Sequence, residues 1–165
     1  DWAAAAAAFR EAVDTRLPYP FFKCSLAETL YQQGDLQAAL PLFKAVVQAD
    51  RRSVRVWLRI ADTELRLHGA AAAEGVYRSA LGVDPTVADV HSGLARLVVG
   101  TKGAAAYAEA ISLLRVVVLL EPDSDAAFSV LGALFHAEGQ LDAAALQFRA
   151  AVALRPNSPT YHCRM

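Results

Sequence analysis

The sequence predicts an all-α protein made of tandem helix pairs, and three observations support this prediction. Alanine makes up about a fifth of the chain and isoleucine occurs only twice, a composition that favours helices over strands. Residues of the same type return with a period of 34 positions. Glycines and prolines return at the points where helices of that period would end.

Four kinds of landmark define the period. A large apolar residue returns at Phe9, Phe43, Tyr77, Leu114 and Phe148. The small residue four places before it is Ala5, Ala39, Ala73, Ala110 or Ala144. Turn glycines follow the same register at Gly34, Gly69, Gly103 and Gly139, and prolines close three repeats at Pro85, Pro122 and Pro156. Because the landmarks agree, they indicate true internal repeats.

The period divides the chain into consecutive repeats, each with two helices and a tight turn. Residues 1–19 are expected to form the second helix of a partial repeat. Complete repeats follow at 20–53, 54–87, 88–124 and 125–158, and residues 159–165 begin another. The repeat 88–124 has a three-residue insertion near Gly100–Gly103. A single helix pair cannot bury its own apolar face, so neighbouring repeats must stack on one another.

The repeat 125–158 shows the local logic most clearly. Its first helix has apolar residues at the spacing of one helix face, at Phe128, Leu131, Leu134 and Phe135. Gly139 is expected to end this helix in a left-handed conformation. The second helix is expected to bury Leu141, Ala144, Ala145, Phe148, Ala151 and Val152. Pro156 then stops it, because proline lacks the N–H group and clashes with the preceding turn.

These landmarks resemble the tetratricopeptide repeat (TPR), whose pattern is W-x₂-L-G-x₂-Y, A-x₃-F and P within 34 residues. The repeat 54–87 carries it at Trp57, Ile60, Ala61, Ala73, Tyr77 and Pro85. The repeat 125–158 carries it at Phe128, Leu131, Gly132, Phe135, Ala144, Phe148 and Pro156. The repeat 20–53 departs further, with Lys23 in place of the tryptophan and Arg51 in place of the proline. The repeat 88–124, which has His91 at the tryptophan place, is the weakest match. The resemblance implies a right-handed α-solenoid, in which first helices line a concave, peptide-binding surface, and a segment of a longer repeat protein.

Helix geometry at about 100° per residue selects the side chains that face this concave surface. The candidate partner-binding residues are Phe21, Cys24, Glu28, Tyr31, Arg55, Leu58, Arg59, Asp62, Arg66, Asp89, Ser92, Arg96, Ser129 and His136. One interpretation is an arginine cluster that grips an acidic or phosphorylated segment. The other, which we favour, is that Arg59 and Arg66 are neutralised by Asp62 at i+3 and i+4 spacing.

One class of TPR ligand is disfavoured by the residues themselves. TPR co-chaperones that hold a C-terminal carboxylate use Lys and Asn at the places of Cys24 and Glu28. Because Glu28 would repel a carboxylate, we do not predict a receptor for chaperone tails.

Other function classes find little support in the sequence. Lys and Arg total 16 against 17 Asp and Glu, so no global charge favours nucleic acid. The longest apolar stretch, Ile111–Leu120, is short for a membrane span and contains Arg115. No metal, cofactor or catalytic motif is recognisable, and Gly100–Gly103 lacks the spacing of a phosphate loop. Cys24 and Cys163 form no disulfide framework, which favours an intracellular, reducing compartment, either the cytoplasm or an organelle interior.

The sequence thus predicts a non-enzymatic scaffold or adaptor that binds another protein or peptide within a larger assembly. One alternative is the substrate-selecting segment of a larger enzyme, such as a glycosyltransferase. A second is an RNA-binding helical-repeat protein, which would show a salt-dependent affinity for RNA. The repeat ends are also free to stack on further repeats or on a second copy.

Overall fold

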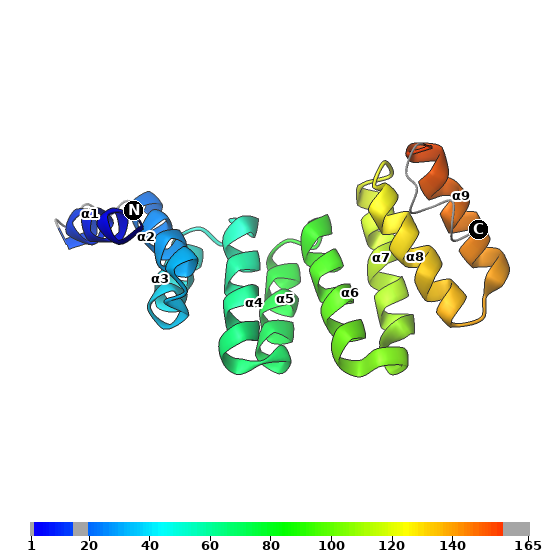
Figure 1. The fold of residues 1–165 in the computed structure, drawn as a ribbon, viewed down its shortest axis with the longest axis horizontal. Helices are drawn as coiled ribbons and strands as arrows, with labels where there is room; N and C mark the ends of the chain where they lie inside the picture. The colour runs from blue at the N-terminus through cyan, green and yellow to red at the C-terminus, as the bar shows by residue number, and fades with distance from the viewer. Residues whose placement is uncertain (1, 15–19, 157–165) are drawn as a thin grey trace. The chain divides into compact units, whose positions relative to one another are not determined.

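A computed structural model describes residues 2–14 and 20–156, and these residues are almost entirely helical (Figure 1). The helices are α1 (Trp2–Asp14), α2 (Pro20–Gln33), α3 (Leu36–Ala49), α4 (Val54–His68), α5 (Ala70–Val83), α6 (Ala88–Lys102), the 3₁₀ turn η1 (Gly103–Ala106), α7 (Tyr107–Leu120), α8 (Asp125–Ala137) and α9 (Leu141–Leu154). No strand occurs in the described ranges. The predicted all-α fold is therefore confirmed, whereas the beginning of a repeat at 159–165 lies outside the described residues.

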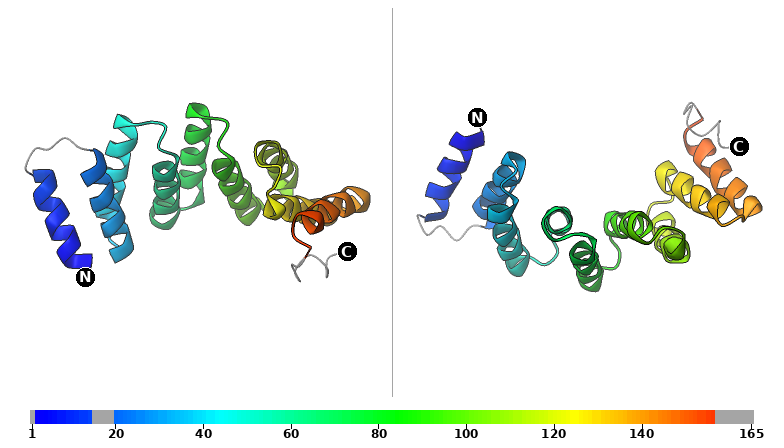
Figure 2. Two further views of the ribbon diagram at one scale, coloured as in Figure 1. Left: turned by 90° about the horizontal axis from the view of Figure 1, so that it is seen from above. Right: turned by 60° about the horizontal axis from the view of Figure 1, so that its bottom comes forward.

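The helices form two compact units, Asp1–Pro85 and Thr86–Met165, here called unit 1 and unit 2. In unit 1 each helix from α1 to α5 packs on the next along the chain. In unit 2 α6 packs on α7, α7 on α8 and α8 on α9. Helices of one pair run antiparallel because a tight turn joins them, as Figure 1 shows for α4 and α5 and the right view of Figure 2 shows for α8 and α9.

Glycines with positive φ form the turns inside the helix pairs. They are the four predicted turn glycines, Gly34, Gly69, Gly103 and Gly139. At Gly139 the φ angle is 76°, which a residue with a Cβ atom adopts only with strain. The backbone N–H of Gln140 then bonds to the carbonyl of Phe135, so the chain reverses and α9 begins at once.

The small landmark residues lie where helices approach most closely. Ala39, Ala73 and Ala110 are completely buried, and Ala144 is 2% exposed. In unit 2 the ring of Phe148 packs directly over Gly132, and a Cβ atom at that glycine would lie 2.9 Å from two ring carbons. A small residue at these places is therefore a requirement of the helix packing.

One predicted core position is wrong. Leu141 was expected to be buried, but its side chain is 63% exposed. The residue is the first of α9, so it lies beyond the end of the packed stripe formed by Ala144, Phe148 and Ala151. Ala145 and Val152 are only half-buried.

The helical run Ala88–Leu120 is long and apolar enough, by length and composition alone, to cross a membrane. The structure breaks this run at Gly103, where φ is 59°, and folds its two halves, α6 and α7, against each other. Each half has at most 15 residues, or about 22 Å of helix, which is shorter than the ~30 Å hydrocarbon core of a bilayer. The run is thus better explained as an apolar helix pair than as a membrane span.

Candidate functional site

In unit 1, α2 and α4 are the first helices of the repeats 20–53 and 54–87, and an ion pair joins them. The Nε and Nη2 atoms of Arg59 donate hydrogen bonds to the Glu28 carboxylate at 3.1 and 2.5 Å. The Nη2 atom of Arg55 lies 3.6 Å from the same carboxylate. Glu28 is therefore occupied by the arginines that were candidates for ligand binding.

Tyr31 forms a second link between the same two helices. Its hydroxyl donates a hydrogen bond to the Asp62 carboxylate. The guanidinium groups of Arg59 and Arg66 lie 4.6 and 5.6 Å from the centre of its ring, within cation–π range. Burial, followed by the hydrogen bond to Asp62, raises the pKa of Tyr31, so its hydroxyl remains a donor.

The predicted neutralisation of the arginines occurs, but with other partners. We expected Asp62 to pair with Arg59 and Arg66 along α4. Among the described residues, Arg59 instead pairs with Glu28, and Asp62 bonds to Tyr31, both across to α2. Arg55, Arg59 and Arg66 share unit 1, whereas Arg96 belongs to unit 2.

The remaining candidates on α2 and α4 differ in exposure. Phe21 is 70% exposed and meets Phe22 edge-on, with ring centres 5.7 Å apart. Leu58 is half-buried. Cys24 is also half-buried, and burial followed by the charge of Glu28 raises the pKa of its thiol, which makes it a poor nucleophile. No group of three possible metal ligands occurs within the described residues.

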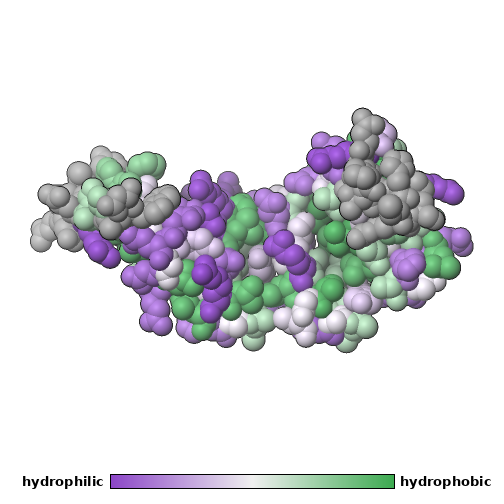
Figure 3. Space-filling model, in the orientation of Figure 1, coloured by the Kyte–Doolittle hydropathy of each residue, from purple (hydrophilic) through white to green (hydrophobic). Residues whose placement is uncertain are grey.

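The first helices of unit 2, α6 and α8, border a groove of about 520 Å³. We call it the first-helix groove. Its lining is Ser92, Ala95, Arg96, Val99, Gly100, Leu114, Ser124, Ala126, Ala127, Val130 and Leu134. Val130 is 49% exposed, and Arg96 is the single charged side chain in the lining that the described part of the chain provides. On the face shown in Figure 3, green hydrophobic patches lie over α6 to α8, whereas purple hydrophilic residues predominate over α2 to α4.

Of the candidates in unit 2, Ser92 and Arg96 line this groove. Asp89 and His136 are exposed outside its lining. Ser129, which was expected on the same surface, is buried with 7% exposure. The candidate set missed the apolar floor, including Ala95 and Leu134, because helical periodicity assigns those places to packing between helices.

A buried carboxylate lies on a different part of unit 1. Glu64 of α4 occupies a place where the TPR pattern has tyrosine and is 7% exposed. Lys44 Nζ of α3 lies 2.7 Å from Glu64 Oε1, and His68 Nδ1 lies 2.5 Å from Glu64 Oε2. The hydrogen bond from Lys44 is the main cause that lowers the pKa of Glu64. This group therefore acts as an ion pair that joins α3 to α4.

Comparison with known proteins agrees with this architecture. Two models of the tetratricopeptide repeat match, one at residues 30–97 and the other at residues 1–54 and 101–159. No curated protein sequence matches the chain.

Three solved structures of similar fold are distant in sequence. A crystal structure of MamA has a TM-score of 0.78 and 17% identity, covering 94% of this chain and 90% of MamA. A thermophilic TPR protein of Thermus thermophilus has a TM-score of 0.65 and 22% identity, covering 99% and 88%. A TPR protein of Parabacteroides merdae has a TM-score of 0.79 and 16% identity, covering 99% and 64%. The family models, together with the helix pairs and turn glycines, show that this chain belongs to the tetratricopeptide repeat family.

Proposed function

We propose that this chain is a protein-binding scaffold that receives a peptide segment of its partner in the first-helix groove of unit 2. The observation that carries the proposal is the combination of an apolar floor with the single cation Arg96 at its edge. Such a groove suits a segment with apolar side chains and one carboxylate, because arginine binds carboxylates through two parallel hydrogen bonds.

The arginines of unit 1 are a weaker candidate for the same role. Arg59 already donates two hydrogen bonds to Glu28, so an acidic ligand would have to compete with a carboxylate held in place. The guanidinium of Arg66 forms a cation–π contact with the ring of Tyr31. These side chains stabilise the face between α2 and α4 instead of offering an empty anion site.

The mechanism is the presentation of preset side chains. Arg96 on α6 and Val130 on α8 already line the groove in the chain without a partner. A segment that binds such a surface loses its own conformational freedom, but the scaffold loses little of its own. Binding to a partner, rather than a chemical step, is then the contribution of this chain to its assembly.

A quantitative pull-down from host lysate tests this proposal. The baits are the wild-type chain and the single variants Arg96→Glu and Val130→Glu, with Arg55→Glu in unit 1 as the matched charge control. A partner that both groove variants lose, and that Arg55→Glu keeps, supports the first-helix groove. Equal capture by all four baits contradicts it. Thermal melts of the variants check that these changes at exposed positions leave the fold intact.

A further inference from the structure

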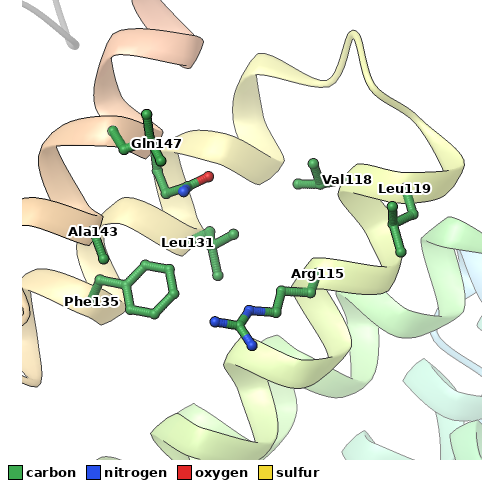
Figure 4. Close-up of a pocket in the computed structure, with 8 residues that line it drawn as sticks. Arg115, Val118, Leu119, Leu131, Phe135, Ala143 and Gln147 are labelled. Carbon is green, nitrogen blue, oxygen red and sulfur yellow. The ribbon is translucent and has the colours of Figure 1, made fainter.

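A second groove lies in unit 2 between the second helices α7 and α9, with α8 at its floor (Figure 4). We call it the second-helix groove. Its volume is about 450 Å³, and its lining is Arg115, Val118, Leu119, Leu131, Phe135, Ala143, Leu146 and Gln147. It shares no lining residue with the first-helix groove, although α8 contributes side chains to both.

The sides of this groove are unusually apolar for an exposed surface. Leu119 on α7 is 81% exposed and Leu146 on α9 is 63% exposed, whereas Leu131 and Phe135 of α8 are buried beneath them. Both exposed leucines line one groove together with buried apolar residues, and grouped apolar residues mark interaction sites more often than isolated exposed residues do.

Among the described residues that line the groove, Arg115 is the only one with a charged side chain. In Figure 4 it extends from α7 toward Phe135, and its guanidinium lies 5.7 Å from the centre of that ring. Within the described part of the chain, the structure gives it this cation–π contact and no ion pair. Its hydrogen-bond donors therefore have no carboxylate to bind.

Unit 1 contains the equivalent groove, which shows what is different in unit 2. The register that aligns Phe43 with Leu114 and Trp57 with Phe128 also aligns Lys44 with Arg115. The unit 1 groove is lined by α3, α4 and α5 and includes Lys44, Gln48, Glu64 and Gly75. The cation of the unit 1 groove forms an ion pair inside the groove, because Lys44 Nζ lies 2.7 Å from Glu64 Oε1.

The corresponding positions of unit 2 carry side chains of different chemical character. Phe135 of unit 2 corresponds to Glu64 of unit 1. The described lining of the second-helix groove therefore contains the cation Arg115 but no carboxylate. Leu119 replaces Gln48, and Leu146 replaces Gly75, so the rims have become apolar. Among the aligned lining positions, the two grooves thus differ in the acid, in these two rim residues and in Val76, which corresponds to Gln147 in unit 2.

We propose that the second-helix groove of unit 2 is a separate docking site for a partner protein segment that carries a carboxylate between large apolar side chains. The carboxylate binds Arg115 and supplies the charge that Glu64 supplies in unit 1. The apolar side chains pack against Leu119 and Leu146. A membrane surface is a poorer match, since attraction to anionic lipids requires several clustered cations and this groove has one.

The test uses a displayed library of helical peptides, selected on the whole chain and counter-selected on the Leu146→Gln variant. Enriched peptides should carry Asp or Glu flanked by Leu, Ile or Met. For a synthesised peptide of this set, Leu119→Gln and Leu146→Gln should each weaken binding by about tenfold in fluorescence anisotropy. Leu141→Gln, at an equally exposed leucine of α9 outside the groove lining, is the matched control and should leave its affinity unchanged.

A double-mutant cycle, with one change in Arg115 and one in the acid of the peptide, then tests the contact between these two groups. Arg115→Gln should lower the affinity of the chain for the selected peptide by about fivefold or more. It should not lower the affinity for a peptide in which the Asp or Glu is replaced by Asn or Gln. Equal loss for both peptides overturns the proposed contact. The proposal is overturned if the enriched peptides lack Asp and Glu. It is also overturned if no enriched peptide requires Leu146 for binding. A concentration-dependent dimer in sedimentation, abolished by Leu146→Gln, overturns it in favour of a second copy of this chain.

Discussion

Arg59 of α4 donates two hydrogen bonds to Glu28 of α2, although 31 residues separate them in the chain. Each side chain is less than a third exposed, so solvent screens the pair only in part. Because α2 and α4 are the first helices of successive repeats, this pair ties one repeat to the next on the face that was expected to bind ligands.

A double-mutant cycle measures what this pair contributes to stability. Glu28→Gln and Arg59→Gln should each lower the free energy of unfolding, and the double variant should lose less than the sum of the two. A coupling of about 1 kcal/mol is expected for a partly buried pair of this geometry. Urea unfolding followed by circular dichroism gives the four values. Additive losses would show that the pair contributes nothing to the stacking of the repeats.

Glu64 gives the stability a defined dependence on pH. The hydrogen bond from Lys44 lowers its pKa below the ordinary value of 4.5, so the folded chain holds this carboxylate ionised more readily than the unfolded chain does. The resulting stabilisation is fully present above pH 4.5 and is lost as pH falls through the lower, folded-state pKa. Glu64→Gln should therefore reduce the loss of stability on acidification below that value.

Urea unfolding at neutral pH and at several values below 4.5 tests this expectation. The exposed carboxylate Glu121, at the end of α7, provides the control variant Glu121→Gln. An acid-induced loss in Glu64→Gln as large as that of the wild-type chain would contradict the assignment of this pH dependence to Glu64.

The sequence was sufficient to predict the features that local chemistry sets. A glycine such as Gly139 marks a turn because its backbone requires positive φ, and a buried alanine such as Ala73 marks a close helix contact. Both requirements act on single positions and repeat with the period. The helices and their pairing were therefore predictable from spacing, whereas the family followed from the resemblance to the TPR pattern.

Side-chain pairing across helices was harder to predict. Periodicity places Glu28, Arg59 and Asp62 on one surface, but spacing along α4 favoured a pair between Asp62 and Arg59 that does not form. The partner actually chosen depends on where α2 lies against α4. Burial also departs from periodicity where a helix begins or where a neighbour covers its edge, as at Leu141 and Ser129.

Ala73 provides a test of the small landmark residue. It is completely buried in α5 of unit 1, so Ala73→Leu forces three extra carbons into a packed contact. Overpacking of this kind should lower the free energy of unfolding by about 1–3 kcal/mol. Ala71→Leu, at an exposed position of the same helix, is the control and should change stability little. Thermal unfolding of both variants is the measurement, and equal stability of the two would contradict the proposed register.

Gly132 provides the sharper test, because two opposing effects of one methyl group can be separated. In an exposed helix, Gly→Ala stabilises by about 0.5–1 kcal/mol through lower backbone entropy. At Gly132 the new Cβ would lie 2.9 Å from the ring of Phe148, which is itself buried and cannot move aside without disturbing its neighbours. Gly132→Ala should therefore destabilise by about 1–3 kcal/mol, as overpacking does.

Gly75 in α5 is the matched control, since a Cβ there meets nothing within 4 Å. Gly75→Ala should stabilise the chain, so the two variants should move in opposite directions in urea unfolding. The double variant Gly132→Ala with Phe148→Leu should lose less stability than the sum of the two single variants, because the smaller side chain leaves room for the methyl group. Stabilisation by both single variants would mean that helix propensity alone decides these positions, and that the close approach of Gly132 to Phe148 is not required by the fold.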